Sequence, residues 1–296
     1  MIDTGRVWKV PSTAMTDAPS DPVPSELLDN VDPPVDNADV AVAGRQGETH
    51  MGFARSLATI LFVIALPVAI LTTNVRLLLN APLVYDYALD RYGAEETTGL
   101  SREDLDGTTA ALRDYFNNGE TTFYNTVTQN GLPGPVFNAR ETRHMEDVKE
   151  LVVLLNRIQM LSVMFIVAYG VVFFVWSPEG NLRQLAGQCL AGLLVGFLAI
   201  GAVGAVAAVG FDAAFERFHQ VAFSNDLWRL NPRTDHLIQM FPEEFWRDAT
   251  FMLGALCLLE AALIAAVAGI YLLSSRGERR HLAGSVSASA STTQAA

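Results

Sequence analysis

Four long apolar runs constrain this chain more than any other feature, because each is long enough to cross a bilayer as one helix. They cover about residues 53–79, 150–176, 184–210 and 248–273, and a membrane-spanning helix needs about 20 mainly apolar residues. Hydrophobic residues make up 50% of the sequence and charged residues 18%, with the charges concentrated between the runs rather than spread as on a soluble domain. The sequence therefore predicts an all-α membrane protein with four transmembrane helices.

The two ends of the chain differ from this central part. Residues 1–50 are acidic and rich in Pro, Asp, Ser and Ala, and residues 276–296 end in a Ser/Ala-rich tail. Segments of this composition bury too little apolar surface to offset the loss of chain entropy. We therefore expect a disordered acidic N-terminal segment, a four-helix membrane domain over residues 51–275, and a disordered C-terminal tail.

The orientation follows from the positive charges beside the last run. Arg276, Arg279 and Arg280 directly follow it, which predicts a cytoplasmic C-terminus. Four spans then put the N-terminus in the cytoplasm as well. The two longer connections, residues 80–149 and 211–247, are expected to lie outside the cell and to carry most of the polar chemistry.

The first external connection shows signs of helical structure. Ser101 and Asp104 have the spacing of a capping box, and the helix that follows is expected to end at Asn117-Asn-Gly119. Residues 130–135 (Asn-Gly-Leu-Pro-Gly-Pro) are expected to form a loop. We thus expect a partly helical extracytoplasmic subdomain between the first and second transmembrane helices.

Composition also excludes several classes of partner and cofactor. The formal net charge is -12, which argues against nucleic acid, because nucleic acid is bound by basic patches. The sequence has no phosphate-binding loop of the GxxxxGK[ST] type, so we expect no nucleotide and no cofactor. Cys189 and Cys257 both fall within apolar runs and are expected to be small core residues rather than a disulfide.

Two histidines flank the membrane domain at the same expected height. His144 precedes the second run and His219 follows the third. At about 1.5 Å per residue, each would lie about 50 Å from the short connection at residues 177–183, if both helices continue that far. Three interpretations remain open: a catalytic pair, two interfacial side chains, or a metal pair with Asp147, Asp226 or Glu243 as further ligands. The spacing lacks any HExxH or CxxC pattern, which leaves the metal pair the weakest of the three.

A few residues inside the runs also stand out. Arg157 and Glu260 are ionisable groups within the membrane and are expected to form an ion pair that fixes the bundle. Arg76, near the outer end of the first span, is a candidate to bind an anionic headgroup or a carboxylate. Gly192 and Gly196 form a GxxxG pair that permits close helix packing. Most aromatic residues of the second external connection are expected to form an interfacial belt.

The sequence resembles the lipoprotein intramolecular transacylase family of bacterial four-helix membrane proteins over roughly residues 55–275. The resemblance rests on long motifs around both histidines: His144-Met-Glu-Asp-Val-Lys149, Phe218-His219, Asn225-Asp226-x-Trp228 and Asp235-x-Leu-Ile-x-Met-Phe-Pro-Glu243-x-Phe. It implies an enzyme of the bacterial cytoplasmic membrane that moves the sn-2 acyl chain of a diacylglyceryl lipoprotein to its N-terminal cysteine amine. The product is a lyso-form lipoprotein.

The resemblance also assigns roles to particular residues. It implies that His144 and His219 form the catalytic pair. We expect His219 to be the base and His144 its orienting or proton-relaying partner, and the reverse division of roles stays open. Asp147, Arg76, Asn225, Asp226 and Glu243 are supporting candidates, with Asn225 or a backbone amide stabilising the oxyanion. The bilayer and diacylglyceryl lipoproteins would be the partners. The competing hypothesis is a non-enzymatic membrane protein that assists assembly or binds lipid.

Overall fold

The structure is a computed structural model that describes residues 37–129, 131–176 and 182–294, with side chains described for 53–128, 131–175 and 182–275. The chain divides into two units, Met1–Phe53 and Ala54–Ala296. The described part of the first unit is the beginning of helix α1 (Asn37–Asn80). The rest of α1 and every later helix and strand belong to the second unit.

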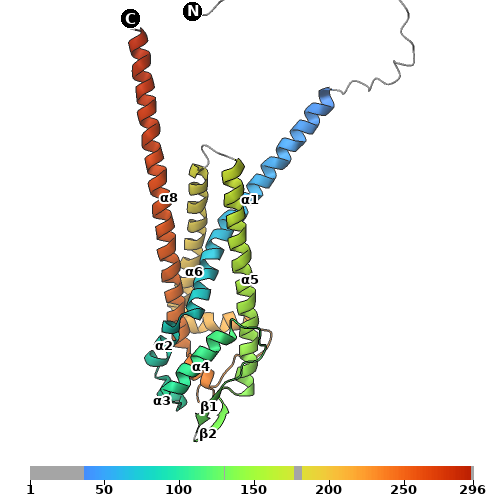
Figure 1. The fold of residues 1–296 in the computed structure, drawn as a ribbon, viewed down its shortest axis with the longest axis vertical. Coiled ribbons are helices and arrows are strands. Elements are labelled where there is room, and N and C mark those ends of the chain that lie inside the picture. The colour runs from blue at the N-terminus through green and yellow to red at the C-terminus, as the bar shows by residue number, and fades with distance from the viewer. Residues whose placement is uncertain (1–36, 130, 177–181, 295–296) are drawn as a thin grey trace, which may run out of the picture. The chain divides into compact units, whose positions relative to one another are not determined.

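Four helices are long and apolar enough to cross a membrane, as the sequence predicts. The spanning candidates are Phe53–Asn80, Ala139–Val175, Leu182–Ala222 and Glu243–Ser275. They belong to α1, α5 (Ala139–Trp176), α6 (Leu182–Ala222) and α8 (Glu243–Gln294) (Figure 1). The apolar runs at 150–176, 184–210 and 248–273 fall inside these helices. Each helix is therefore longer than its apolar run.

The helices also extend into the two segments expected to be disordered. α1 begins at Asn37 and α8 ends at Gln294, so residues 37–50 and 276–294 are helical, whereas residues 1–36 lie outside the described part. Neither helical extension contains a proline. Adding residues to an existing helix avoids the costly nucleation step, so a polar composition does not by itself stop a helix that the membrane segment has already started.

Six short elements gather at one end of the four helices (Figure 1). They are α2 (Pro82–Arg91), α3 (Ala94–Thr98), α4 (Arg102–Tyr115), β1 (Thr126–Gln129), β2 (Leu132–Pro135) and α7 (His236–Met240). We call this part, residues 81–138 and 223–242, the cap. Its hydrophobic core is continuous with the first turns of α5 and α8, since buried Leu105, Tyr115 and Met240 cluster with Met145 and Phe245.

The local signals within the cap gave mixed results. The N-cap is confirmed: Ser101 is the N-cap of α4, and its side chain accepts a hydrogen bond from the Asp104 N–H. The loop expected at residues 130–135 is wrong for 132–135, because Leu132–Pro135 pairs antiparallel with Thr126–Gln129; Gly131 is in a turn, and residue 130 lies outside the described part. The sequence Asn130-Gly131 is a strong hairpin signal, and Gly131 has a φ of 80°. The fold is therefore helical with one small hairpin rather than purely α.

The GxxxG pair lies where α6 packs tightly against α1. A Cβ on Gly192 would lie 2.9 Å from the Val63 carbonyl oxygen, and one on Gly196 would lie 2.8 Å from the Pro67 Cβ. Pro67 lacks the N–H that would otherwise bond the Val63 carbonyl. The backbone of α6 thus packs where proline has interrupted the hydrogen bonding of α1, and only residues without a side chain fit there.

α6 does not continue straight past the membrane. Its backbone leaves the helical region at Gly210 (φ -169°, ψ 78°), and the segment beyond it turns sideways and runs across toward α5 (Figure 1). Asp212 is the first charged residue after Arg183, so the turn coincides with the end of the apolar run. The assumption of two straight helices is therefore wrong for α6. The membrane-spanning parts of α5 and α6 are accordingly taken as residues 151–175 and 183–210.

The expected ion pair between Arg157 and Glu260 is also wrong. Glu260 instead accepts a hydrogen bond of 3.0 Å from the Asn74 side chain, and within the described side chains no ion pair includes Arg157. Asn74 is 1% exposed and also donates to the Ile70 carbonyl. A neutral amide therefore satisfies the carboxyl group of α8 from α1, without burying a guanidinium beside it.

Candidate functional site

His144 and His219 meet where the cap joins the membrane helices. Their ring centroids are 6.1 Å apart with an interplanar angle of 37°. His144 is 7% exposed and His219 is 8% exposed. They meet because the sideways end of α6 carries His219 toward α5 (Figure 1). The two histidines are thus close, as the sequence suggested, but because α6 turns at Gly210 and not because two straight helices reach the same height.

The imidazole of His219 is fixed by its own helix. Its Nδ1 lies 2.8 Å from the Phe215 carbonyl oxygen, one turn earlier. A carbonyl only accepts hydrogen bonds, so Nδ1 carries the proton in the neutral ring, and Nε2 is left unprotonated. His219 therefore presents a hydrogen-bond acceptor at Nε2, as a general base must.

The imidazole of His144 is held differently. Its Nδ1 is buried and has no hydrogen-bond partner among the described residues. An unpaired buried polar atom is costly in a folded protein and calls for an explanation.

Aromatic side chains enclose the two rings. The ring of His219 lies 4.3 Å from that of Phe215 and 5.0 Å from that of Trp228, and the ring of His144 lies 5.2 Å from that of Phe223. These aromatics line the histidines and do not act only as an interfacial belt. The spacing Phe215-x-x-x-His219-x-x-x-Phe223 contains this signal, since residues four apart share a helix face.

Burial keeps both imidazoles neutral. His144 lies in the charged first turns of α5 and His219 lies beyond the turn at Gly210, so both are outside the membrane-spanning parts. Burial, reinforced by the positive charge that His219 can carry, lowers the pKa of His144 to about 4, against a smaller opposing effect of Asp147. Burial also lowers the pKa of His219, against the opposing effect of the Phe215 carbonyl. Both rings are therefore ready to accept a proton at neutral pH.

Two of the supporting candidates bond to each other beside the pair. The Asn225 side chain donates a 2.9 Å hydrogen bond to Asp147 Oδ2 and accepts one of 3.0 Å from the Leu227 N–H. Asp147 is on α5, one turn after His144. Asn225 thus ties the cap loop that holds Trp228 to the helix that holds His144.

The other three candidates do not contact either ring in the described part of the chain. Asp226 pairs with Arg229 at 3.3 Å, and Arg76 donates to Gln159 Oε1 at 3.1 Å rather than to a carboxylate. Glu243 is the first residue of α8, where its charge suits the positive helix end. Within the described residues no three His, Cys, Asp or Glu side chains are grouped to hold a metal ion.

Sequence reasoning missed Glu141, which is 1% exposed. Its Oε2 accepts from the Asn138 N–H at 2.7 Å, while Asn138 Oδ1 accepts from the Glu141 N–H at 3.1 Å. This is a reciprocal capping box at the start of α5, and Asn-x-x-Glu is its sequence signal. The second carboxylate oxygen accepts from the Leu237 N–H of α7 at 2.6 Å. Glu141 thus holds the cap to α5 one turn before His144.

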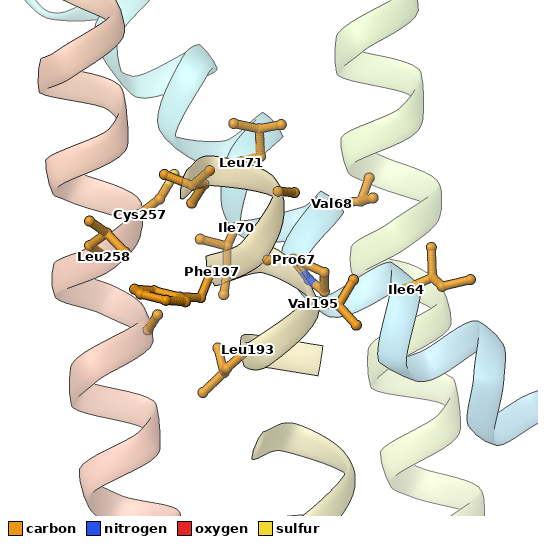
Figure 2. A pocket seen from close by; sticks show the side chains of 14 residues that line it. Ile64, Pro67, Val68, Ile70, Leu71, Leu193, Val195, Phe197, Cys257 and Leu258 are labelled. Carbon is orange, nitrogen blue, oxygen red and sulfur yellow. The ribbon is translucent and has the colours of Figure 1, made fainter. Parts of the chain in front are cut away.

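An apolar pocket of about 190 Å³ lies deeper in the bundle, between α1, α6 and α8. Figure 2 shows Pro67, Phe197 and Cys257 lining it from these three helices. At about 1.5 Å per residue, the helix between Gly196 and Gly210 is about 21 Å long. One leaflet of the hydrocarbon core is about 15 Å thick, so this pocket lies near the membrane centre and is separate from the histidine pair. Cys257 and Cys189 are both free thiols.

Comparison with known proteins gives a consistent result. The sequence model described as lipoprotein intramolecular transacylase Lit matches residues 60–246. An uncharacterized protein of Aquifex aeolicus (strain VF5) is 27% identical over 223 residues, which cover 71% of this chain and 92% of that protein.

Solved structures show the same fold. The in meso structure of the membrane integral lipoprotein intramolecular transacylase from Bacillus cereus superposes with a TM-score of 0.64 at 19% identity, covering 77% of this chain and 99% of that one. A second structure of that protein, with one histidine replaced by arginine, gives a TM-score of 0.62 at 19% identity over 80% and 99% of the two chains. The family match covers more than half of the sequence, and the chain belongs to the lipoprotein intramolecular transacylase family of membrane-integral acyltransferases.

Proposed function

We propose that this protein moves the sn-2 O-acyl chain of a diacylglyceryl lipoprotein to the amine of its own N-terminal cysteine, with His144 and His219 as the catalytic pair. The observation that carries the proposal is the pairing of two buried imidazoles, one with a fixed acceptor nitrogen and one with an unpaired nitrogen, in a chain of the transacylase family. The reaction exchanges an ester for an amide, which is favourable without a nucleotide.

His219 is the general base in this mechanism. The α-amine of a lipoprotein has an ordinary pKa of about 7.7–8.0, so it is largely protonated and unreactive at neutral pH. In the fraction that is neutral, the nitrogen attacks the sn-2 carbonyl carbon, and His219 Nε2 accepts the N–H proton as the C–N bond forms. The Phe215 carbonyl supports this role, because it stabilises the imidazolium through the Nδ1–H.

His144 acts on the leaving group in the next step, when the tetrahedral intermediate collapses. The tetrahedral intermediate breaks its C–O bond to the glycerol, and the departing alkoxide needs a proton. The proton taken by His219 returns to this oxygen, directly or by way of His144, whose buried Nδ1 has no protein partner in the described chain. Amine and ester belong to one substrate molecule, so correct positioning lowers the reaction barrier. In well-oriented intramolecular reactions this effect reaches about 7–11 kcal/mol.

The aromatic enclosure supports transfer to an amine rather than to water. Phe223 and Trp228 close the rings from the side of the cap, and exclusion of water from a reactive site suppresses hydrolysis. The site lies on the side of the bilayer away from the cytoplasm in this proposal, because Arg276, Arg279 and Arg280 follow the fourth span. Both termini are then cytoplasmic, in the inner membrane of a bacterium.

The reaction is tested directly with purified protein in lipid vesicles and a synthetic diacylglyceryl lipopeptide. We expect one acyl chain to move to the amine without any added nucleotide, so that the product has the same mass as the substrate and an amide-linked chain that resists mild alkali. A lipopeptide whose amine is already acetylated is the matched control and should not react. Release of free fatty acid would identify a hydrolase, and an unchanged lipopeptide would favour the non-enzymatic alternative.

A further inference from the structure

The sideways end of α6, residues 211–222, has two distinct faces. At 3.6 residues per turn, its apolar side chains share one side of the helix: Phe211, Ala214, Phe215, Phe218, Val221 and Ala222. The opposite side carries Glu216, Arg217 and Gln220. A short helix with one apolar and one charged face is typical of segments that lie in the plane of a membrane interface.

The polar face is satisfied by its own neighbours. Gln220 accepts a hydrogen bond of 3.1 Å from Arg217 Nη1 and donates one of 3.2 Å to Glu216 Oε1. Glu216 also pairs with Arg229 of the cap at 3.1 Å. One ion pair, between Glu216 and Arg229, therefore links this face to the cap, and the face stays exposed to water.

The apolar face has no such cover. Phe218 is 51% exposed and Val221 is 78% exposed. The membrane-spanning part of α6 directly precedes this segment in the chain, and its last turn presents Val209 at 92% exposure. The occupant of the Val209 side is lipid, because that part of the helix crosses the membrane. The same occupant accounts for Phe218 and Val221, since large apolar side chains are stabilised at the boundary between headgroups and acyl chains.

His219 lies at the border between the two faces. It directly follows Phe218, with ring centroids 5.3 Å apart, and it precedes Val221 by two residues. An acyl chain lying on the apolar face therefore has its ester at the height of the histidine pair. An acyl chain in the deep pocket near Pro67 and Cys257 would not place its ester beside the histidines, because that pocket lies about 21 Å along α6 from the turn at Gly210.

We infer that residues 211–222 form an interfacial helix whose apolar face, marked by Phe218 and Val221, binds a lipid acyl chain and is the lateral entrance from the bilayer to His144 and His219. The placement in the interface rests on the exposure of Phe218 and Val221, on the separation of apolar and charged helix faces, and on the position of the segment directly after the membrane-spanning part of α6. The role as an entrance rests on the proposed acyl transfer as well.

The placement is tested by spin labels at two adjacent positions on opposite faces. Val221→Cys and Gln220→Cys are made in a Cys189→Ala, Cys257→Ala background, and collision with oxygen and with a water-soluble nickel chelate is measured in vesicles. We expect the label at 221 to collide several-fold more with oxygen than with the chelate, and the label at 220 to show the reverse. Equal access of the chelate to both labels would overturn the placement, as would protection of residue 221 from both reagents, which would indicate a protein partner.

The entrance is tested by the same pair of positions. Val221→Asp puts a charge on the lipid face, whereas Gln220→Asp puts it on the polar face. We expect Val221→Asp to reduce acyl transfer at least tenfold at low substrate density in the vesicle, with partial recovery at high density, and Gln220→Asp to stay within about twofold of the unmodified protein. Equal activity of the two variants would overturn the entrance. Inactivity of the unmodified protein would instead overturn the proposed function and leave the spin-label result standing.

Discussion

The imidazole of His219 reaches to within 6.1 Å of the imidazole of His144, centroid to centroid, because α6 turns at Gly210 and brings its last helical turns across to α5. The pair therefore joins a helix that crosses the membrane to one that lies across the bundle end. Its geometry depends on the cap, since Trp228 and Phe223 pack on the rings from a loop that Asn225 ties to Asp147.

The two histidines should behave as one unit. We expect His144→Gln and His219→Gln each to lower the rate of acyl transfer about 10²–10⁴-fold, the range for loss of a general acid or base. The double variant should transfer the acyl chain at most about tenfold more slowly than the less active single variant, because the effects of groups that act together are not additive. Rates of N-acylation for all four proteins complete this cycle. Independent, multiplicative losses would show that the histidines do not share a step.

The pH dependence should follow the substrate rather than the enzyme. The lowered pKa values of His144 and His219 mean that both rings stay neutral as the pH falls below the ordinary histidine value of about 6.5. The rate should therefore rise with pH up to the pKa of the substrate amine, about 7.7–8.0, and then level off. A rate profile from about pH 5 to about pH 9 checks this. An acid limb centred near pH 6.5 would contradict the burial of the pair.

Burial of neutral histidines also has a cost in acid. A histidine with a lowered folded-state pKa binds fewer protons than the unfolded chain, so stability is lost as the pH falls from the ordinary value of about 6.5 toward the folded-state pKa, which is about 4 for His144. His144→Gln should reduce this loss of thermal stability between the two pH values. The midpoint of thermal unfolding in detergent at both ends of the window measures it. An unchanged pH slope would mean that His144 is already charged in the folded protein.

Trp228 should affect the rate of acyl transfer by keeping the His219 imidazole neutral. Its ring lies 5.0 Å from that of His219 at an interplanar angle of 30°, and such aromatic contacts contribute about 1 kcal/mol, or about fivefold in rate. We expect Trp228→Ala to slow transfer by at least this factor and to raise the pKa of His219 by admitting water, so that an acid limb appears in the rate profile. Trp228→Phe should largely restore the original profile. Loss of rate without a change in profile would limit Trp228 to a structural role.

Glu141 should be needed for the stability of the cap. Glu141→Ala removes the acceptor of the Asn138 and Leu237 N–H groups, and each buried N–H left unpaired costs about 1–3 kcal/mol. Glu150→Ala, on the same helix and exposed, is the matched control. Thermal unfolding in detergent should fall clearly for Glu141→Ala and little for the control. Equal midpoints would contradict the role of Glu141.

The contact between α6 and α1 predicts opposite effects for similar glycines. Alanine at Gly192 or Gly196 places a Cβ within 3 Å of α1 atoms, whereas Gly201 and Gly204 have nothing within 4 Å. We expect Gly196→Ala to destabilise the bundle by about 1–3 kcal/mol through overpacking, and Gly204→Ala to be neutral or slightly stabilising. Comparable losses for both variants would indicate that the close approach at Pro67 is not present in the bilayer.

Much of this architecture is predictable from the sequence. The four spans follow from run length, because a bilayer fixes how many apolar residues a helix needs. The Ser101–Asp104 cap follows from local hydrogen bonding. His144 and His219 were recognisable as a pair from their positions beside two neighbouring spans and from the motifs around them, and their proximity was expected although for an incorrect reason.

What the sequence did not reveal depends on contacts between distant segments. The turn at Gly210 results from where the apolar run stops and where α5 offers a partner, which no local signal specifies. The bond between Asn74 and Glu260 joins α1 to α8, and neither residue identifies the other in advance. The hydrogen bond that fixes the acceptor nitrogen of His219 depends on a rotamer. Glu141 had a readable Asn-x-x-Glu signal, but its second bond to α7 depends on the folded cap.

The N-terminal lipopeptide of a lipoprotein, expressed together with this protein in a bacterium whose own lipoproteins are diacylated, shows whether the acyl chain moves to the cysteine nitrogen. Tandem mass spectrometry of that peptide locates each acyl chain on the glycerol or on the cysteine nitrogen. We expect one N-linked and one O-linked chain with the unmodified protein, and two O-linked chains when His144→Gln or His219→Gln replaces it at equal abundance in the membrane. Two O-linked chains with the unmodified protein, or an N-linked chain with both histidine variants, would contradict this expectation.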